Sequence, residues 1–384
     1  MSRRYKILAL IGDGIAEEIV PEAIKVLKVA EKTYGFNLEI LGPYGFGAKY
    51  WVTHGMEMGC DPAVTEELIF EADGIFKGPV GLPEWIGKLP GPNLPVNLRP
   101  DLDVYANIRP CRLRPGVDSV LVGRQAGDID YIVLRENTEQ MYVGAGGFVS
   151  RAMETEIGLD VFVQTRKGCE RVIKYGFELA QTGEYKGKRG APADGKSRLT
   201  CCGKWGRCRG DELFKETFME VAEEYPDVET DYAWIDAWSY WAIMKPDFYD
   251  VAVMPNQYGD IMSDMSGAIQ GSMGLAGSLN AGDDHCYAEA THGSAPDIAG
   301  EGIANPTSII LSVGMMLNWI GDKRDDARLK AAYRGIDTAI DTVLTEGKIR
   351  TPDLKGINST TQFGNAVAEI INTQNESNPF LSSP

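Results

Sequence analysis

Two aspartates four residues apart stand where an apolar segment gives way to a polar one. Asp260 and Asp264 belong to the sequence Met254-Pro-Asn-Gln-Tyr-Gly-Asp-Ile-Met-Ser-Asp, in which a strand ends, Gly259 turns the chain and a helix begins. The spacing puts both carboxylates in the first turn and on one helix face. Grouped carboxylates suit a hard divalent cation, although the same residues could serve only to cap the helix and complement its dipole.

A third carboxylate lies in an apolar stretch, Trp-Ile-Asp-Ala-Trp, at residues 234–238. We expect Asp236 to be buried between the tryptophans, and a buried aspartate needs a compensating partner. A bound cation would be such a partner. The predicted metal ligands are therefore Asp236, Asp260 and Asp264.

Arginines form the second chemical element of the sequence. Arg99, Arg109 and Arg135 stand beside prolines or at the edges of predicted elements. A guanidinium group binds a carboxylate through two parallel hydrogen bonds. One such arginine would most simply form a surface ion pair, but three together with a metal site predict a ligand with two or three carboxylates.

Short apolar runs alternate with helical periodicity along the chain. Strands are expected near Lys6–Ile11, Gly74–Phe76, Tyr131–Leu134 and Val251–Met254, and helices near 17–27, 172–179, 213–224 and 309–320. Such alternation predicts an α/β fold. The first turn, Gly12-Asp-Gly-Ile-Ala-Glu, lacks the third glycine of the Rossmann dinucleotide-binding fingerprint, so a dinucleotide would have to be bound by another route.

Composition excludes several classes of protein. The 384 residues carry a formal net charge of −17, which disfavours nucleic acid and acidic membrane surfaces as partners. The apolar runs are too short to span a bilayer, and no signal-peptide core follows the basic N-terminus. The seven cysteines include no C-x-x-C pair, which is typical of reduced thiols in a cytoplasmic protein.

One nucleotide-binding pattern is present without its context. Residues 190–197, Gly-Ala-Pro-Ala-Asp-Gly-Lys-Ser, match the Walker A pattern of phosphate-binding loops. A basic segment precedes this pattern and a predicted strand follows it, whereas a phosphate loop needs a buried strand before it and a helix after it. We therefore interpret the segment as a surface hairpin, and an ATPase as the weakest of the candidate functions.

Taken together, the motifs are similar to those of the isocitrate/isopropylmalate dehydrogenase family of metal-dependent, decarboxylating dehydrogenases. The resemblance runs from about residue 7 to about residue 371. It is carried by Gly12-Asp-Gly-Ile, Tyr105-Ala-Asn-Ile-Arg-Pro, Arg135-Glu-Asn-Thr-Glu-Gln-Met-Tyr-Val-Gly, Gly259-Asp-Ile-Met-Ser-Asp and His292-Gly-Ser-Ala-Pro-Asp-Ile-Ala-Gly-Glu-Gly-Ile-Ala-Asn-Pro306.

The resemblance implies a two-domain α/β fold that is not a Rossmann fold, with a discontinuous cofactor domain (1–104 plus 271–384) and a substrate and dimerisation domain (105–270). It also implies site residues. The three arginines bind the substrate's carboxylates, Tyr142 and Lys204 act in proton transfer, and Asp236, Asp260 and Asp264 bind Mg²⁺ or Mn²⁺. In the homodimer, Lys204 and Asp236 reach the site from the partner subunit.

The cofactor site implied by the resemblance lies on the loop after His292. Asp297 occupies the position that selects the cofactor, because a carboxylate there hydrogen-bonds ribose hydroxyls and repels a 2′-phosphate, so that NAD is favoured over NADP. The implied cofactor-binding residues are Ile15, Glu289, His292, Gly293, Ala295, Asp297 and Asn305.

The implied reaction is NAD-dependent oxidation and decarboxylation of a 3-substituted malate. The chain departs from the family pattern after Lys204, where Trp-Gly follows, and at Gln140, which replaces a usual glycine. In the substrate loop, Asn93, Pro95 and Val96 match neither isocitrate nor isopropylmalate enzymes. A tartrate or D-malate dehydrogenase and a non-catalytic regulatory homologue therefore remain as alternatives.

Overall fold

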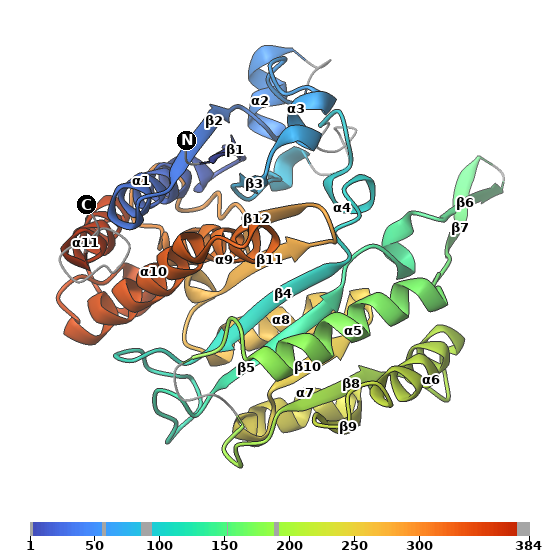
Figure 1. The fold of residues 1–384 in the computed structure, drawn as a ribbon. Coiled ribbons are helices and arrows are strands. Elements are labelled where there is room, and N and C mark those ends of the chain that lie inside the picture. The colour runs from blue at the N-terminus through green and yellow to red at the C-terminus, as the bar shows by residue number, and fades with distance from the viewer. Residues whose placement is uncertain (1–2, 56–58, 86–93, 152, 188–191, 375–384) are drawn as a thin grey trace. The chain divides into compact units, whose positions relative to one another are not determined.

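The computed structural model describes residues 3–55, 59–85, 94–151, 153–187 and 192–374, and it is α/β as expected (Figure 1). The chain forms two compact units. Unit 1 comprises Met1–Val104, Leu113–Ala126 and Gly267–Pro384, and unit 2 comprises Tyr105–Arg112 and Gly127–Ser266. Residues 113–126 and 267–270 thus fall in the unit that contains both termini.

Unit 1 is built on a mainly parallel arrangement of strands in the order β2-β1-β3-β12-β11. The neighbours β1–β2, β1–β3 and β3–β12 are parallel, whereas β12 and β11 are antiparallel. The strands are β1 (Arg4–Leu10), β2 (Asn37–Tyr44), β3 (Gly74–Lys77), β11 (Gly277–Ala281) and β12 (Cys286–Ala290).

Helices cover these strands with their apolar faces. Ile19, Ala23 and Leu27, which the sequence places on one face of the first helix, are fully buried, and the buried face of that helix packs on the last three helices. The helices of unit 1 are α1 (Ala16–Tyr34), α2 (Ala48–His54), α3 (Glu66–Glu71), α4 (Leu98–Asp101), α9 (Thr307–Arg324), α10 (Ala327–Glu346) and α11 (Thr360–Thr373).

Unit 2 contains strands in the order β4-β5-β10-β8-β9. The first pair is antiparallel, and β5, β10, β8 and β9 run parallel to one another. The strands are β4 (Ala106–Arg112), β5 (Asp130–Glu136), β8 (Arg198–Gly203), β9 (Glu229–Trp234) and β10 (Val251–Met254), so the strands expected at 131–134 and 251–254 are confirmed.

Both faces of these strands are covered. Tyr131 and Leu134 point to opposite faces of β5 because side chains alternate along a strand. The Tyr131 ring packs edge-on against Trp238, while Leu134 lies beneath Gly176 on the other face. The helices are α5 (Arg166–Thr182), α6 (Arg209–Ala222), α7 (Ile235–Met244) and α8 (Asn256–Ile269).

A separate two-stranded hairpin extends from unit 2 (Figure 1). Strand β6 (Gly146–Arg151) pairs antiparallel with β7 (Glu154–Asp160), and Phe148 and Leu159 are 80% and 57% exposed. Among the helices that the structure describes, none combines the length and apolar character needed to cross a bilayer. Asn93 of the predicted substrate loop, and residues 190 and 191 of the Walker-like segment, lie outside the described residues.

Candidate active site

Four of the predicted site residues of unit 2 lie at or shortly after the carboxyl ends of its parallel strands. Arg135 is the penultimate residue of β5, Lys204 follows β8, and Asp236 comes two residues after β9. Helix α8, which carries Asp260, follows β10 directly. Because the carboxyl ends of parallel strands meet at one edge of a sheet, this edge is the usual place for an α/β ligand site.

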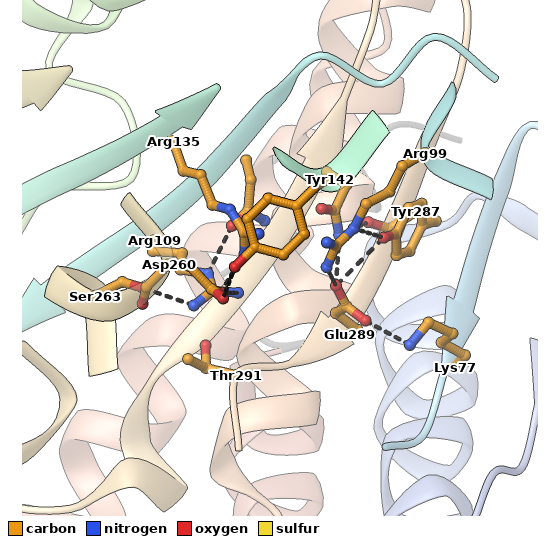
Figure 2. Close-up of polar contacts among 12 residues, drawn as sticks. Lys77, Arg99, Arg109, Arg135, Tyr142, Asp260, Ser263, Tyr287, Glu289 and Thr291 are labelled. Carbon is orange, nitrogen blue, oxygen red and sulfur yellow. Dashed lines mark hydrogen bonds and ion pairs between the residues drawn. The ribbon is translucent and has the colours of Figure 1, made fainter. Parts of the chain in front are cut away.

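One carboxylate joins the predicted substrate and catalytic residues. Asp260 accepts a short hydrogen bond from Arg135 and lies 3.7 Å from Nη2 of Arg109 (Figure 2). The Tyr142 hydroxyl donates to Oδ2 of Asp260 at 2.8 Å. Asp264 lies 3.5 Å from Nη1 of Arg109, so both aspartates approach one guanidinium. We call Arg109, Arg135, Tyr142, Asp260 and Asp264 the α8 cluster.

The two guanidinium groups of the α8 cluster are buried and are oriented by hydrogen bonds to neutral side chains. Arg109 and Arg135 are only 7% and 1% exposed. Both also donate to neutral acceptors, which keep each fork oriented without removing its charge. Arg109 donates to Asn107 and Ser263, both at 2.6 Å, and Arg135 donates to Asn256 at 2.8 Å. Sequence reasoning missed these three supporting residues, because a polar side chain beside a motif carries no signal of its own.

The start of α8 corrects the prediction made from Gly259. The helix begins at Asn256, so Gly259 lies inside its first turn instead of forming a bend, and Asp260 and Asp264 lie further into the helix. A Cβ atom on Gly259 would lie 2.5 Å from the Cβ of Arg135. The glycine is therefore needed for the close approach of the helix to β5, which brings Asp260 to the arginine.

Lys204 and Asp236 form a separate pair. Nζ of Lys204 donates to Oδ1 of Asp236 at 2.6 Å, and this hydrogen bond lowers the pKa of the aspartate. The prediction that Asp236 is buried is wrong, since its side chain is 63% exposed. Ile235 and Trp238 enter the core at this point of α7, whereas Asp236 faces outward.

Below Lys204 lies a buried carboxylate. Asp211 is fully buried, and its Oδ2 accepts the backbone N–H of Lys204 at 2.7 Å. Burial raises the pKa of Asp211, which the bond from Lys204 partly offsets. The bond fixes the turn after β8, in which the sequence departs from the family pattern.

The predicted metal ligands are only partly gathered in one chain. Within the described residues, no group of three or more His, Cys, Asp or Glu side chains is arranged to hold a metal ion. Asp260 and Asp264 offer carboxylate oxygens, which suit Mg²⁺ or Mn²⁺. The donor chemistry fits such an ion provided that another carboxylate comes from outside this chain.

Unit 1 holds its own charged group at the end of β12. Glu289 is 7% exposed and forms an ion pair with Lys77 at 2.5 Å. Arg99 donates to the Tyr287 hydroxyl at 3.0 Å and lies 3.4 Å from Oε1 of Glu289 (Figure 2). Arg99 and Glu289 were predicted to bind substrate and cofactor, respectively, and they are neighbours. Lys77 and Tyr287 were missed.

The predicted cofactor loop is folded against the first turn of the chain. The backbone N–H of Ile15 donates to the Ser294 carbonyl at 2.9 Å. A Cβ on Gly14 would lie 2.0 Å from that oxygen, so only glycine fits there. Ala295 has a φ of 38°, and Gly293 and Asp297 are exposed. Together these contacts fix the path of the loop.

Two polar side chains of this loop, those of His292 and Asn305, were predicted to contact the nucleotide cofactor. Burial lowers the pKa of His292 and so favours the neutral form of its ring. Its Nε2 atom is buried without a hydrogen-bond partner in the described part of the chain. The Asn305 amide donates to Asp353 at 3.0 Å and accepts from the Thr307 N–H at 3.0 Å. A neutral ring with an unused nitrogen fits an adenosine group, which offers hydrogen-bonding edges and an aromatic face.

Comparison with known proteins gives consistent results over nearly the full length. The model of the family Isocitrate/isopropylmalate dehydrogenase matches residues 6–367. The chain is 37% identical to D-malate dehydrogenase [decarboxylating] of Escherichia coli (97% of this chain, 99% of that protein) and 36% identical to 3-isopropylmalate dehydrogenase of Thermobifida fusca (97% and 99%). It is also similar to the crystal structure of isocitrate dehydrogenase from Methylococcus capsulatus, with a TM-score of 0.80 and 34% identity (96% of this chain, 99% of that chain).

The first prediction concerns the charge balance of the α8 cluster. We expect Asp260→Asn to lower the free energy of unfolding by about 2 kcal/mol, because it leaves the buried Arg135 without its carboxylate. Asp264→Asn is the matched control on the same helix, and its exposed side chain predicts a change below about 0.5 kcal/mol. Chemical denaturation at low salt measures both. Equal losses for the two variants would contradict the assignment.

Proposed function

We propose a function for this chain from its family: it belongs to the isocitrate/isopropylmalate dehydrogenase family. It is a cytoplasmic enzyme that depends on NAD and on Mg²⁺ or Mn²⁺. It oxidises and decarboxylates a malate-type 2-hydroxy acid. The observation that carries the proposal is Asp260, a carboxylate that accepts hydrogen bonds from Arg135 and Tyr142 and forms an ion pair with Arg109 at the carboxyl edge of the strands. The described cysteines are all free thiols, in keeping with a reducing compartment.

The proposed site residues fall into those that bind the substrate and those that would bind the metal ion. Arg109 and Arg135, and by family likeness Arg99, bind the substrate's carboxylates. A bound divalent cation, held by Asp260, Asp264 and a second copy's Asp236, would polarise the substrate's hydroxyl, and bound NAD⁺ would accept the hydride.

Protons are handled by two side chains. Lys204, as the neutral amine, takes the proton of the substrate's hydroxyl, and the ammonium group that forms is oriented by Asp236, to which Nζ donates. Tyr142, whose hydroxyl already donates to Asp260, delivers a proton to carbon after CO₂ has left. Each role needs only a group within hydrogen-bonding reach of the substrate.

The packing of the substrate loop bears on the substituent at carbon 3. An isopropylmalate enzyme needs apolar side chains around that substituent. Here Val96 and Leu98 are buried in the core of unit 1, and Leu94 packs against the same core. These side chains therefore pack against the protein itself instead of lining a pocket for the substituent. This observation favours the second candidate, a D-malate or tartrate dehydrogenase, over an enzyme for a large apolar substituent.

Turnover across a panel of substrates tests the proposal. With Mn²⁺ and NAD⁺, we expect NADH to form with D-malate or tartrate at a kcat/KM at least about tenfold above that with 3-isopropylmalate or isocitrate, equivalent to ~1.4 kcal/mol. NADH absorbance at steady state gives the rates. Tight ligand binding with no turnover on any member would instead favour a regulatory homologue, and phosphate release from ATP would favour the Walker-like segment.

Cofactor choice is assigned to Asp297, whose exposed carboxylate opposes the 2′-phosphate of NADP. We expect Asp297→Ala to reduce the preference for NAD⁺ over NADP⁺, measured as the ratio of kcat/KM values, by about tenfold, or ~1.4 kcal/mol. Glu301→Ala, an exposed acidic residue four positions further on, is the matched control. The assignment fails if both variants keep the parent ratio.

A shared homodimer accounts for the parts of unit 2 that one chain leaves exposed. The β6–β7 hairpin is marginal as an isolated pair of strands, and its apolar side chains are exposed. Helix α7 exposes Tyr240, Trp241 and Met244 beside Asp236. Exposed apolar surface of this kind marks a protein interface. We therefore assign Lys204 and Asp236 to the site of the partner subunit.

Mixing two inactive variants tests the shared site. In a heterodimer of Asp260→Asn and Asp236→Asn chains, one site carries both substitutions and the other carries neither. Random pairing of equal amounts, after denaturation and refolding, makes half of the dimers mixed and predicts about a quarter of the parent activity. The matched control mixes Asp260→Asn with Asp264→Asn, which lie on one chain's side of the site and predict no recovery. Equal activity in the two mixtures would rule out sharing.

A further inference from the structure

Gln140 stands out in the loop that follows β5. It is fully buried and has a φ of +61°, a left-handed conformation that favours glycine. The strain of this backbone conformation in a residue other than glycine must be offset by favourable contacts of that residue. Its backbone N–H donates to the Val163 carbonyl at 2.7 Å, and this bond holds the start of the turn Gln140–Val143.

The side chain of Gln140 reaches the beginning of α8. Its Oε1 accepts the backbone N–H of Gln257 at 2.6 Å. The first N–H groups of a helix have no partner inside the helix, and Pro255, which precedes α8, has no side-chain acceptor to cap them. Gln140 therefore supplies, from a different element, the cap that the local sequence lacks.

A second contact beside it fastens the same two elements. Nδ2 of Asn256 donates to the Glu139 carbonyl at 3.0 Å, while Oδ1 of Asn256 accepts from Nε of Arg135 at 2.8 Å. Two consecutive residues of the loop are thus bonded to two consecutive residues of the helix. This pair of contacts fixes both the distance between loop and helix and their register.

The loop and the helix meet again at the α8 cluster. Tyr142, two residues after Gln140, donates to Asp260, which lies three residues after Gln257. The contacts close a ring that runs from Gln140 to Tyr142, to Asp260, back along α8 to Gln257, and to Gln140 again (Figure 2 shows Tyr142 and Asp260). A closed ring allows Tyr142 and Asp260 less independent movement than a single contact would.

We propose that Gln140 is a positioning residue, which caps α8 from the Tyr142 loop and thereby holds the Asp260 carboxylate in place for a divalent cation. This inference rests on the proposed function for the role of the cation. The capping contact itself stands on the geometry alone. The acceptor atom carries the effect, because Nε2 of Gln140 has no hydrogen-bond partner among the described residues.

Two variants of matched size isolate that acceptor. Gln140→Met keeps the volume and removes Oε1, whereas Gln140→Glu keeps an acceptor and places a negative charge at a helix N-terminus, where it is favourable. Titration of each metal-free protein with Mn²⁺, followed by calorimetry, gives the dissociation constant without turnover. We expect Gln140→Met to weaken Mn²⁺ binding about tenfold and Gln140→Glu to remain within about threefold of the parent.

A third variant separates capping from backbone conformation. Gln140→Gly relieves the left-handed backbone and removes the cap. If Gln140 acts by capping, Gln140→Gly resembles Gln140→Met in Mn²⁺ affinity and lowers kcat more than it changes the KM of the hydroxy acid. Parent-like Mn²⁺ affinity in Gln140→Met or Gln140→Gly overturns the proposal, and so does equal weakening by Met and Glu.

Hydrogen exchange tests the cap independently of any cation. In peptides that cover residues 256–264, we expect about tenfold faster amide exchange in Gln140→Met than in Gln140→Glu, with parent-like exchange in α9 as the control for folding. Should the parent protein bind no Mn²⁺, the proposed function fails, and this measurement still decides the cap. Identical exchange in the two variants overturns the capping role.

Discussion

The structure of unit 2 depends on the neutralisation of two buried guanidinium groups by one shared carboxylate. Arg109 and Arg135 are almost wholly removed from water, and a buried charge without a partner costs several kcal/mol. Asp260 lies against both, with Asp264 beside Arg109. The helix that carries these aspartates is therefore held to β4 and β5 by ion pairs, and removal of one partner would leave a buried charge uncompensated.

The same balance suits the proposed chemistry. If Arg109 and Arg135 bind the carboxylates of a hydroxy acid, substrate binding exchanges one carboxylate partner for another, and the local charge stays nearly constant. The neutral acceptors Asn107, Asn256 and Ser263 hold the guanidinium forks during this exchange. The site is thus preorganised for an anionic substrate in a chain whose overall charge, −17, would repel one.

The sequence predicts the positions of strands and motifs better than it predicts the contacts between them. The strands at 74–76, 131–134 and 251–254 follow from apolar runs of the expected length, and the structure confirms them. Asp236 was expected to be buried because its neighbours are apolar, but a helix turns adjacent residues about 100° apart, and the aspartate faces outward. Gly259 was interpreted as a turn because nothing in one sequence reveals that Arg135 passes within contact distance of it.

Gln140 and Asp211 show why supporting residues escape such predictions. Each is a buried polar side chain that binds a backbone N–H: Gln140 binds that of Gln257, 117 residues away, and Asp211 binds that of Lys204, 7 residues away. The donor is a main-chain N–H, which every residue except proline has. The type of the donor residue therefore does not reveal which side chain it will bind. Departures from a family pattern carry more information: Gln140 stands where glycine is usual, and Asp211 supports the altered turn after Lys204. Gln140 lies two residues before Tyr142, and Asp211 accepts the backbone N–H of Lys204. Each buried acceptor therefore fixes the backbone of a loop that carries a side chain proposed to transfer a proton.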